Sequence, residues 1–125
     1  MWTVRQPDKT IKFVRRGCAL SIPDAMLRRA IGKSFSRDKV TVFYMFHDIK
    51  SNKAILSPVQ MQTRPPANTQ WTTKGWYSQP NAGSMQVYAS SLIRALGYEP
   101  SQVSGQTVKA SATRGRISFR LPVPK

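Results

Sequence analysis

The chain has 125 residues, with 20 lysines and arginines against five aspartates and glutamates, and a formal net charge of +15 at pH 7. A chain of this length holds one ordinary hydrophobic core, so we expect a single domain over residues 1–125. The positive charge attracts polyanions and points to nucleic acid, DNA before RNA, while the single cysteine excludes an internal disulfide and a thiolate metal cluster.

The chain begins with two predicted strands that an arginine-rich turn connects. Residues 10–14 (TIKFV) alternate between apolar and polar side chains, which is the pattern of a half-buried strand, and residues 18–22 repeat this alternation. Arg15, Arg16 and Gly17 stand between the strands, and a glycine at this place permits the positive φ of a tight turn. The sequence therefore predicts a β-hairpin with a basic tip.

A short helix is predicted after this hairpin. Pro23 stands at its expected first position, where the missing amide hydrogen carries no penalty. Leu27, Ala30 and Ile31 follow the spacing of one apolar helical stripe, and Gly32 ends the helix. We expect this stripe to face the core.

Two further strands complete the first half. Residues 39–46 (KVTVFYMF) and 53–60 (KAILSPVQ) are rich in β-branched and aromatic side chains, and residues 48–52 form the turn between them. Both faces of residues 39–46 are apolar, which indicates a strand that is buried on both sides or lies at an interface between chains. A homo-oligomer is therefore one expected assembly.

Residues 61–83 read as a linker that is rich in threonine, glutamine, asparagine and proline. The linker carries Trp71, Lys74 and Trp76, which interleave aromatic rings with a positive charge. Single-stranded nucleic acid is bound by such a pattern, with bases stacked on rings and the backbone held by cations. Two alternatives stand beside this interpretation: the rings fold back over the core, or the segment forms a hairpin around Lys74 and Gly75.

The second half repeats the order of elements. Residues 83–88 read as a strand, residues 89–96 as a helix that Gly97 ends, and residues 106–112 and 116–123 as a final hairpin. The basic residues in the turn and on the outward face of this last hairpin are Arg114, Arg116 and Arg120. We expect them to contact nucleic acid together with the basic tip of the first hairpin.

The two halves also match in sequence at an offset of 65 residues. Once Ile22 is aligned with Val87, identical residues follow: Leu27 with Leu92, Arg29 with Arg94, Ala30 with Ala95 and Gly32 with Gly97. At an offset of 64, Ser-Pro-Val closes one half and Leu-Pro-Val the other. We interpret the chain as two diverged copies of one unit, repeat one over residues 10–60 and repeat two over residues 84–123.

These motifs resemble those of the AbrB/SpoVT/MazE family of swapped-hairpin DNA-binding domains. The resemblance covers residues 10–60 and rests on the TIKFVRRG hairpin, the ALSIP and LRRAIG segments, and the KVTVFYMF and KAILSPV strands. Residues 83–123 resemble the family pattern more weakly, and Tyr88 stands there at the position that corresponds to Pro23. In both copies the helical segment is one residue longer than the family pattern.

The resemblance implies a mainly β fold with short helices, namely a swapped-hairpin barrel whose two interlocked copies lie in one chain as a pseudo-dimer. It also implies duplex DNA binding without catalysis, as in transcriptional regulators and nucleoid-type proteins, through basic residues on the first hairpin and beside the helix. The matching positions are Lys12, Arg15, Arg16, Arg28, Arg29 and Arg94.

The sequence contains no recognisable catalytic constellation, so we do not expect an enzyme. His47 is the only histidine, and its neighbour Asp48 is expected to point to the opposite face of a strand. The acids are scattered, and we expect neither a metal site nor a cofactor. No signal segment or membrane-spanning apolar run is visible, so we expect a cytoplasmic protein without a membrane partner. A structural or protein-binding role is the remaining alternative class.

Overall fold

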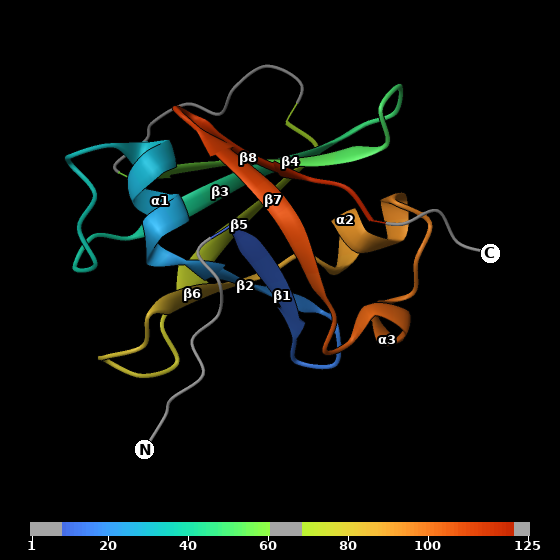
Figure 1. Cartoon of the computed structure of the whole chain (residues 1–125), viewed down its shortest axis with the longest axis horizontal. Coiled ribbons are helices and arrows are strands. Elements are labelled where there is room, and N and C mark those ends of the chain that lie inside the picture. The colour runs from blue at the N-terminus through green and yellow to red at the C-terminus, as the bar shows by residue number, and fades with distance from the viewer. Residues whose placement is uncertain (1–8, 61–68, 122–125) are drawn as a thin grey trace.

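The computed structural model describes residues 9–60 and 69–121, which form an eight-stranded antiparallel closed β-barrel with short helices (Figure 1). The strands are β1 (Thr10–Val14), β2 (Ala19–Pro23), β3 (Thr41–Asp48), β4 (Lys53–Gln60), β5 (Trp71–Trp76), β6 (Ser84–Tyr88), β7 (Thr107–Thr113) and β8 (Arg116–Phe119). The helices are α1 (Asp24–Ile31), α2 (Ser90–Ala95) and α3 (Pro100–Val103). The prediction of a mainly β fold with short helices is confirmed.

Strands from the two halves of the chain alternate in pairs around the barrel. The order is β1-β2-β6-β5-β3-β4-β8-β7, and β7 closes the barrel on β1. Each half therefore contributes two separate hairpin-like ribbons, and four seams join one half to the other. Neither half can close a barrel alone, because every ribbon is flanked on both sides by strands of the other half.

The core lies inside the barrel and is built from the alternating apolar residues of the strands. Ile11 and Phe13 of β1 are fully buried, as are Phe43 of β3 and Ile117 of β8. Phe13 meets Phe119 edge to face, with 6.1 Å between ring centroids. The predicted inward faces of the first and last hairpins are thus confirmed, because a period of two places alternate side chains on one face of a strand.

Helix α1 begins one residue later than expected. Pro23 has an extended backbone, with φ −61° and ψ 144°, and serves as the last residue of β2 and as the N-cap. The buried side chains of α1 are Met26, Leu27 and Ala30, whereas Ile31 is only partly buried. The prediction that Gly32 ends the helix is confirmed, since its φ of 102° is a conformation that residues with a Cβ rarely adopt.

The alternative of a hairpin around Lys74 and Gly75 is wrong, because β5 is one continuous strand through both residues. A Cβ at Gly75 would lie 2.3 Å from the sulfur of Met85 and 2.8 Å from the ring of Phe43. The glycine therefore permits close packing of β5 on the core rather than a turn.

Helix α3 was not predicted from the sequence. The Glu99 amide donates to the side-chain oxygen of Gln102 at 2.8 Å, and this bond is part of a capping box at the start of the helix. Pro100 is the first helical residue. This short helix lies against the turn between β1 and β2 (Figure 1). Its position gives the tip of the first hairpin a packed support.

Candidate nucleic-acid interface

The turn between β1 and β2 holds two consecutive arginines in a left-handed backbone conformation. Arg15 has φ 53° and Arg16 has φ 59°, and the Gly17 amide donates to the Val14 carbonyl at 3.0 Å. Positive φ at both central residues is a feature of type I′ turns, which favour Asn and Gly, and here the turn lies within the loop of residues 15–18 because Val14 pairs with Ala19. An L-residue with a Cβ costs roughly 1 kcal/mol in this conformation, so each of the two arginines makes the turn less stable than a glycine would.

Four neighbouring strands place the side chains beside this turn in one row. Lys12 of β1 is opposite Ser21 of β2, Ser21 is opposite Gln86 of β6, and Gln86 is opposite Trp76 of β5. Lys12 is exposed, and so is Lys74, which lies two residues before Trp76 and therefore on the same face of β5. Residues more than 60 positions apart in the chain thus share one outer surface.

Arg15 and two aromatic rings form the centre of this surface. The Arg15 Nε donates to the side-chain oxygen of Gln86 at 2.8 Å, and the Arg15 guanidinium carbon lies 5.5 Å from the centroid of Trp76. The Trp76 and Tyr88 rings lie 4.7 Å apart with a tilt of 32°, and Tyr88 is 51% exposed. We call the surface formed by Lys12, Arg15, Lys74, Trp76 and Tyr88 the aromatic–cation face.

The structure separates the two tryptophans that the sequence suggested as one platform. Trp71 packs against the hydrophobic core, whereas Trp76 lies on the outer face. Trp76 is five positions after Trp71 along β5, and an odd offset places two side chains on opposite faces of a strand. The outward partner of Trp76 is Tyr88, which sequence reasoning missed. The alternation of β6, with Met85 and Val87 inward, could have identified it.

The predicted arginines near α1 and on the last hairpin lie away from this face, whereas Arg16 is beside Arg15 in the first turn. The β1–β2 turn lies beside α3, while the Gly115 amide of the β7–β8 turn donates to the Ala30 carbonyl of α1 at 2.8 Å. Because β1 and β7 pair antiparallel, these two turns are at opposite ends of the barrel (Figure 1). The expected joint surface of both basic hairpins is therefore not formed. The residues near α1 and on the last hairpin are Arg28, Arg29, Arg114, Arg116 and Arg120.

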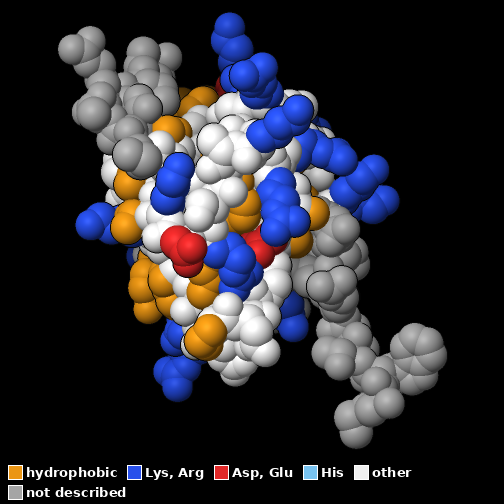
Figure 2. All heavy atoms as spheres, turned by 90° about the vertical axis from the view of Figure 1, so that its left-hand side faces the viewer, with side chains coloured by type: hydrophobic (Ala, Val, Ile, Leu, Met, Phe, Trp, Pro, Cys, Tyr) orange, Lys and Arg blue, Asp and Glu red, His pale blue; other side chains and the backbone are white. Residues whose placement is uncertain are grey.

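The side of the barrel that carries α1 shows lysines and arginines around its surface, with acidic side chains among them (Figure 2). Both ion pairs among the described residues use cations outside the aromatic–cation face. Asp24 pairs with Arg37, and Glu99 pairs with Arg94 at 3.6 Å in an exposed setting. The charge of Arg94, which the resemblance assigned to DNA binding, is thus partly offset, whereas that of the aromatic–cation face is not.

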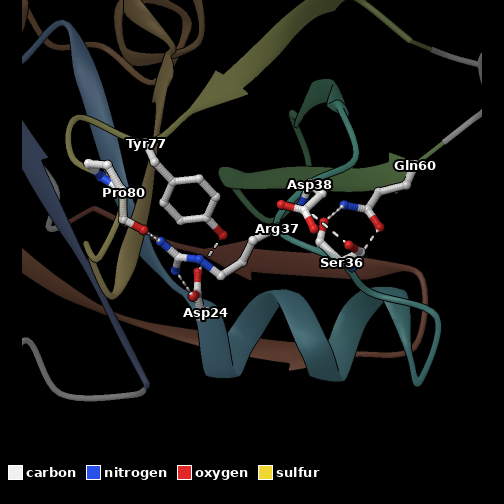
Figure 3. Close-up of polar contacts among 7 residues, drawn as sticks. All are labelled: Asp24, Ser36, Arg37, Asp38, Gln60, Tyr77 and Pro80. Carbon is white, nitrogen blue, oxygen red and sulfur yellow. Dashed lines mark hydrogen bonds and ion pairs between the residues drawn. The ribbon is translucent and has the colours of Figure 1, made fainter.

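Arg37 and Tyr77 form a structural cluster with Asp24 at the start of α1 (Figure 3). The Arg37 guanidinium lies 3.9 Å from the centroid of Tyr77 and donates to the Pro80 carbonyl at 2.7 Å, and the Tyr77 hydroxyl donates to Asp24 at 2.7 Å. Burial, followed by the hydrogen bond to Asp24, raises the pKa of the Tyr77 phenol well above its usual range. The cluster holds residues 77–83 to α1 and leaves little of its charge for a partner.

The histidine and the acids form no recognisable chemical centre in the described part of the chain. The His47 Nε2 lies 2.7 Å from the Asn52 side-chain oxygen within the β3–β4 turn. Residues 9–60 and 69–121 hold no group of three or more histidine, cysteine or acidic side chains that could bind a metal ion. No helix in these same ranges is long and apolar enough to cross a membrane.

Comparison of the chain with protein-family models, with curated proteins and with solved structures found no match.

Proposed function

We propose that this protein binds nucleic acid without catalysing a reaction, with duplex DNA as its principal partner and a regulatory or nucleoid-type role. One observation carries the proposal. Lys12, Arg15 and Lys74 gather with two aromatic rings on a single outer face, and none of the ion pairs among the described residues includes them. Cations without acidic partners attract phosphates and release counterions on binding.

The strand order supports the swapped-hairpin resemblance and a pseudo-dimer within one chain. If β1–β4 are exchanged one by one for β5–β8, the circular order of the barrel is unchanged. This exchange converts the β1·β7 pairing into the β5·β3 pairing. It leaves the β2·β6 and β4·β8 pairings unchanged, because each of them joins two strands that are exchanged with each other. Within β2·β6, Ser21 faces Gln86, which lies 65 positions later, the offset of the sequence repeat.

Two backbone hydrogen bonds have the same relation and extend the β2·β6 ladder by one residue at each end. The Asp24 amide donates to the Gly83 carbonyl at 3.0 Å, and the Ala89 amide donates to the Cys18 carbonyl at 2.9 Å. Each bond becomes the other when the two halves are exchanged with a shift of 65 residues. Both bonds tie the first residues of a helix segment in one half to the start of a strand in the other.

The β1–β2 hairpin is the part that we expect to contact duplex DNA. A two-stranded ribbon fits the major groove, and the arginines at its tip match guanine edges or phosphates. Strained backbone at Arg15 and Arg16 is a feature that often accompanies a functional site. The corresponding turn of the second half, residues 77–83, contains no lysine or arginine. We therefore expect one basic hairpin contact for each molecule.

A salt titration of binding to matched duplex and single-stranded oligonucleotides tests the function, with molecular mass measured alongside. Four cations at the hairpin and on its face, Lys12, Arg15, Arg16 and Lys74, predict a slope of log K against log salt of about −3 to −4 for duplex DNA. A slope near zero, or no measurable binding at low salt, contradicts the proposal.

Single-stranded nucleic acid is the second candidate partner, and the Trp76–Tyr88 pair favours it. Tyr88 is 51% exposed and Trp76 is half-buried, and their tilted ring pair, with an arginine over Trp76, offers a surface for unpaired bases. A duplex keeps its base faces stacked on each other and cannot use the rings in this way. The two candidates therefore differ in how strongly they depend on Trp76.

Replacing Trp76 by alanine should weaken single-strand binding by about 1–3 kcal/mol if bases stack on it, and should change duplex binding much less. Trp76→Phe is the matched control, because it keeps a ring beside Tyr88 and should retain most of the affinity. Equal losses for single and double strands would remove the stacking interpretation. Thermal unfolding of each variant checks that β5 remains folded.

A further inference from the structure

A groove on another side of the barrel gathers positive charge that the proposed function does not use. It has a volume of about 710 Å³ and crosses the outer surfaces of β1, β7, β8 and β4. The cationic residues that line it are Lys9, Lys53, Lys109 and Arg120, and all four are exposed. No acidic residue is among its lining residues, all of which lie in the described part of the chain. We call this surface the basic groove.

The pairing of the strands sets three of these cations side by side. Phe119 of β8 is opposite Ala110 of β7 and Ala54 of β4. The next residue, Arg120, is therefore flanked by Lys109 and Lys53, which precede these two alanines. Neighbouring strands lie about 4.8 Å apart, so three positive charges fall within roughly 10 Å. Like charges opposite each other destabilise a sheet, and a bound anion relieves that repulsion.

The basic groove continues into a second hollow that reaches α1. This hollow has a volume of about 380 Å³ and shares Lys9, Ala110 and Ser111 with the groove. Its far side is formed by Arg29 of α1, and again no acidic residue lines it. The two hollows together form a track that presents five cations.

The centres of the basic groove and of the aromatic–cation face lie on different sides of the barrel, and their margins meet on β1, where Thr10 lines the groove and Lys12 belongs to the face. The face is centred on β2, β6 and β5, whereas the groove is centred on β7 and β8. Around the closed strand order, about half of the barrel separates these two centres. A rigid duplex that lies over Trp76 and Tyr88 therefore cannot also lie over Lys53 and Arg120.

We propose that the basic groove binds the phosphodiester backbone of a second nucleic-acid segment, so that one molecule bridges two segments. The inference rests on the proposed nucleic-acid binding by the aromatic–cation face. The only aromatic residue that lines the groove is Phe119, which is 3% exposed and cannot stack on a base. Lysine, arginine and the serine hydroxyls at 111 and 118 suit phosphate oxygens, so the contact is independent of sequence.

A bridging assay tests this inference on the full chain. One duplex is fixed to beads, and capture of a second, labelled duplex is measured with wild-type protein and with the triple variant Lys53→Gln/Lys109→Gln/Arg120→Gln. We expect the variant to capture the second duplex at least about tenfold less well, while its affinity for one duplex in solution changes by less than about threefold. The control variant Lys33→Gln/Lys39→Gln/Lys50→Gln has the same net charge and should capture like wild type.

The possible outcomes separate this inference from the proposed function. Wild-type protein that binds one duplex but captures no second duplex overturns the bridging inference and leaves the function intact. Capture that survives in the groove variant, or a dimeric mass that accounts for it, assigns the second segment to another surface. Loss of all binding on reversing Arg15 and Arg16 alone contradicts a second site.

Discussion

Reversing the charge of both arginines in the first turn, Arg15→Glu/Arg16→Glu, is expected to weaken duplex binding by about 3 kcal/mol, or roughly 100-fold, at moderate salt. The change removes two cations from the hairpin tip, breaks the Arg15–Gln86 hydrogen bond and places two negative charges where phosphates would lie. Both positions are exposed, so the fold should remain intact. Affinity is measured by fluorescence anisotropy with a short duplex, and thermal unfolding checks the fold.

The last hairpin supplies a matched control for this reversal. Arg114→Glu/Arg116→Glu makes the same change in net charge at the β7–β8 turn, which lies at the opposite end of the barrel. If binding depends on the aromatic–cation face, this control should weaken it by only a few fold. Equal losses from both pairs would mean that the total charge of the protein, rather than the first hairpin, holds the DNA. Any binding that remains in Arg15→Glu/Arg16→Glu should disappear when the three groove substitutions are combined with it in one chain.

Replacing Gly17 by alanine should destabilise the fold by about 3 kcal/mol, or roughly 10–15 °C in Tm for a domain of this size. Gly17 has φ 84° and is buried, and a Cβ at this position would lie 1.8 Å from the Pro100 carbonyl oxygen. The oxygen belongs to the backbone of α3 and cannot move without shifting that helix. Thermal and urea unfolding measure the change in the free energy of unfolding.

Gly115→Ala is the control that separates the clash from the backbone strain. Gly115 has φ 88° in the β7–β8 turn, close to the φ of Gly17, but no atom lies within 4 Å of a Cβ built there. We expect this variant to lose about 1 kcal/mol, which is the cost of a left-handed residue that bears a Cβ. Equal losses in the two variants would show that α3 does not support the first turn. The loss expected for Gly17 also predicts weaker DNA binding, because the arginine tip rests on α3.

Much of the secondary structure could be predicted from the sequence, because local pattern and local chemistry agree. The alternation of residues 10–14 and the extent of β4 are found as expected, and Gly32 ends α1. The errors fall where packing overrides a local signal. Lys74-Gly75 has the composition of a turn, but Met85 and Phe43 need the space that the glycine leaves. The tryptophans were grouped by their closeness in sequence, although strand alternation separates Trp71 from Trp76.

The sequence by itself determined the quantities that depend on composition and on neighbours along the chain. These are the charge of +15, the order of the described strands and helices other than β5 and α3, and the offset of 65 residues between the halves. The tertiary structure alone decided which cations act together, because antiparallel pairing joins residues across the two halves. It places Arg15 beside Trp76, which contacts Tyr88. It sets Lys53, Lys109 and Arg120 side by side, and it places the two basic turns at opposite ends of the barrel. Charge is a sum over residues, whereas a binding surface depends on the register of strands that lie far apart in the chain.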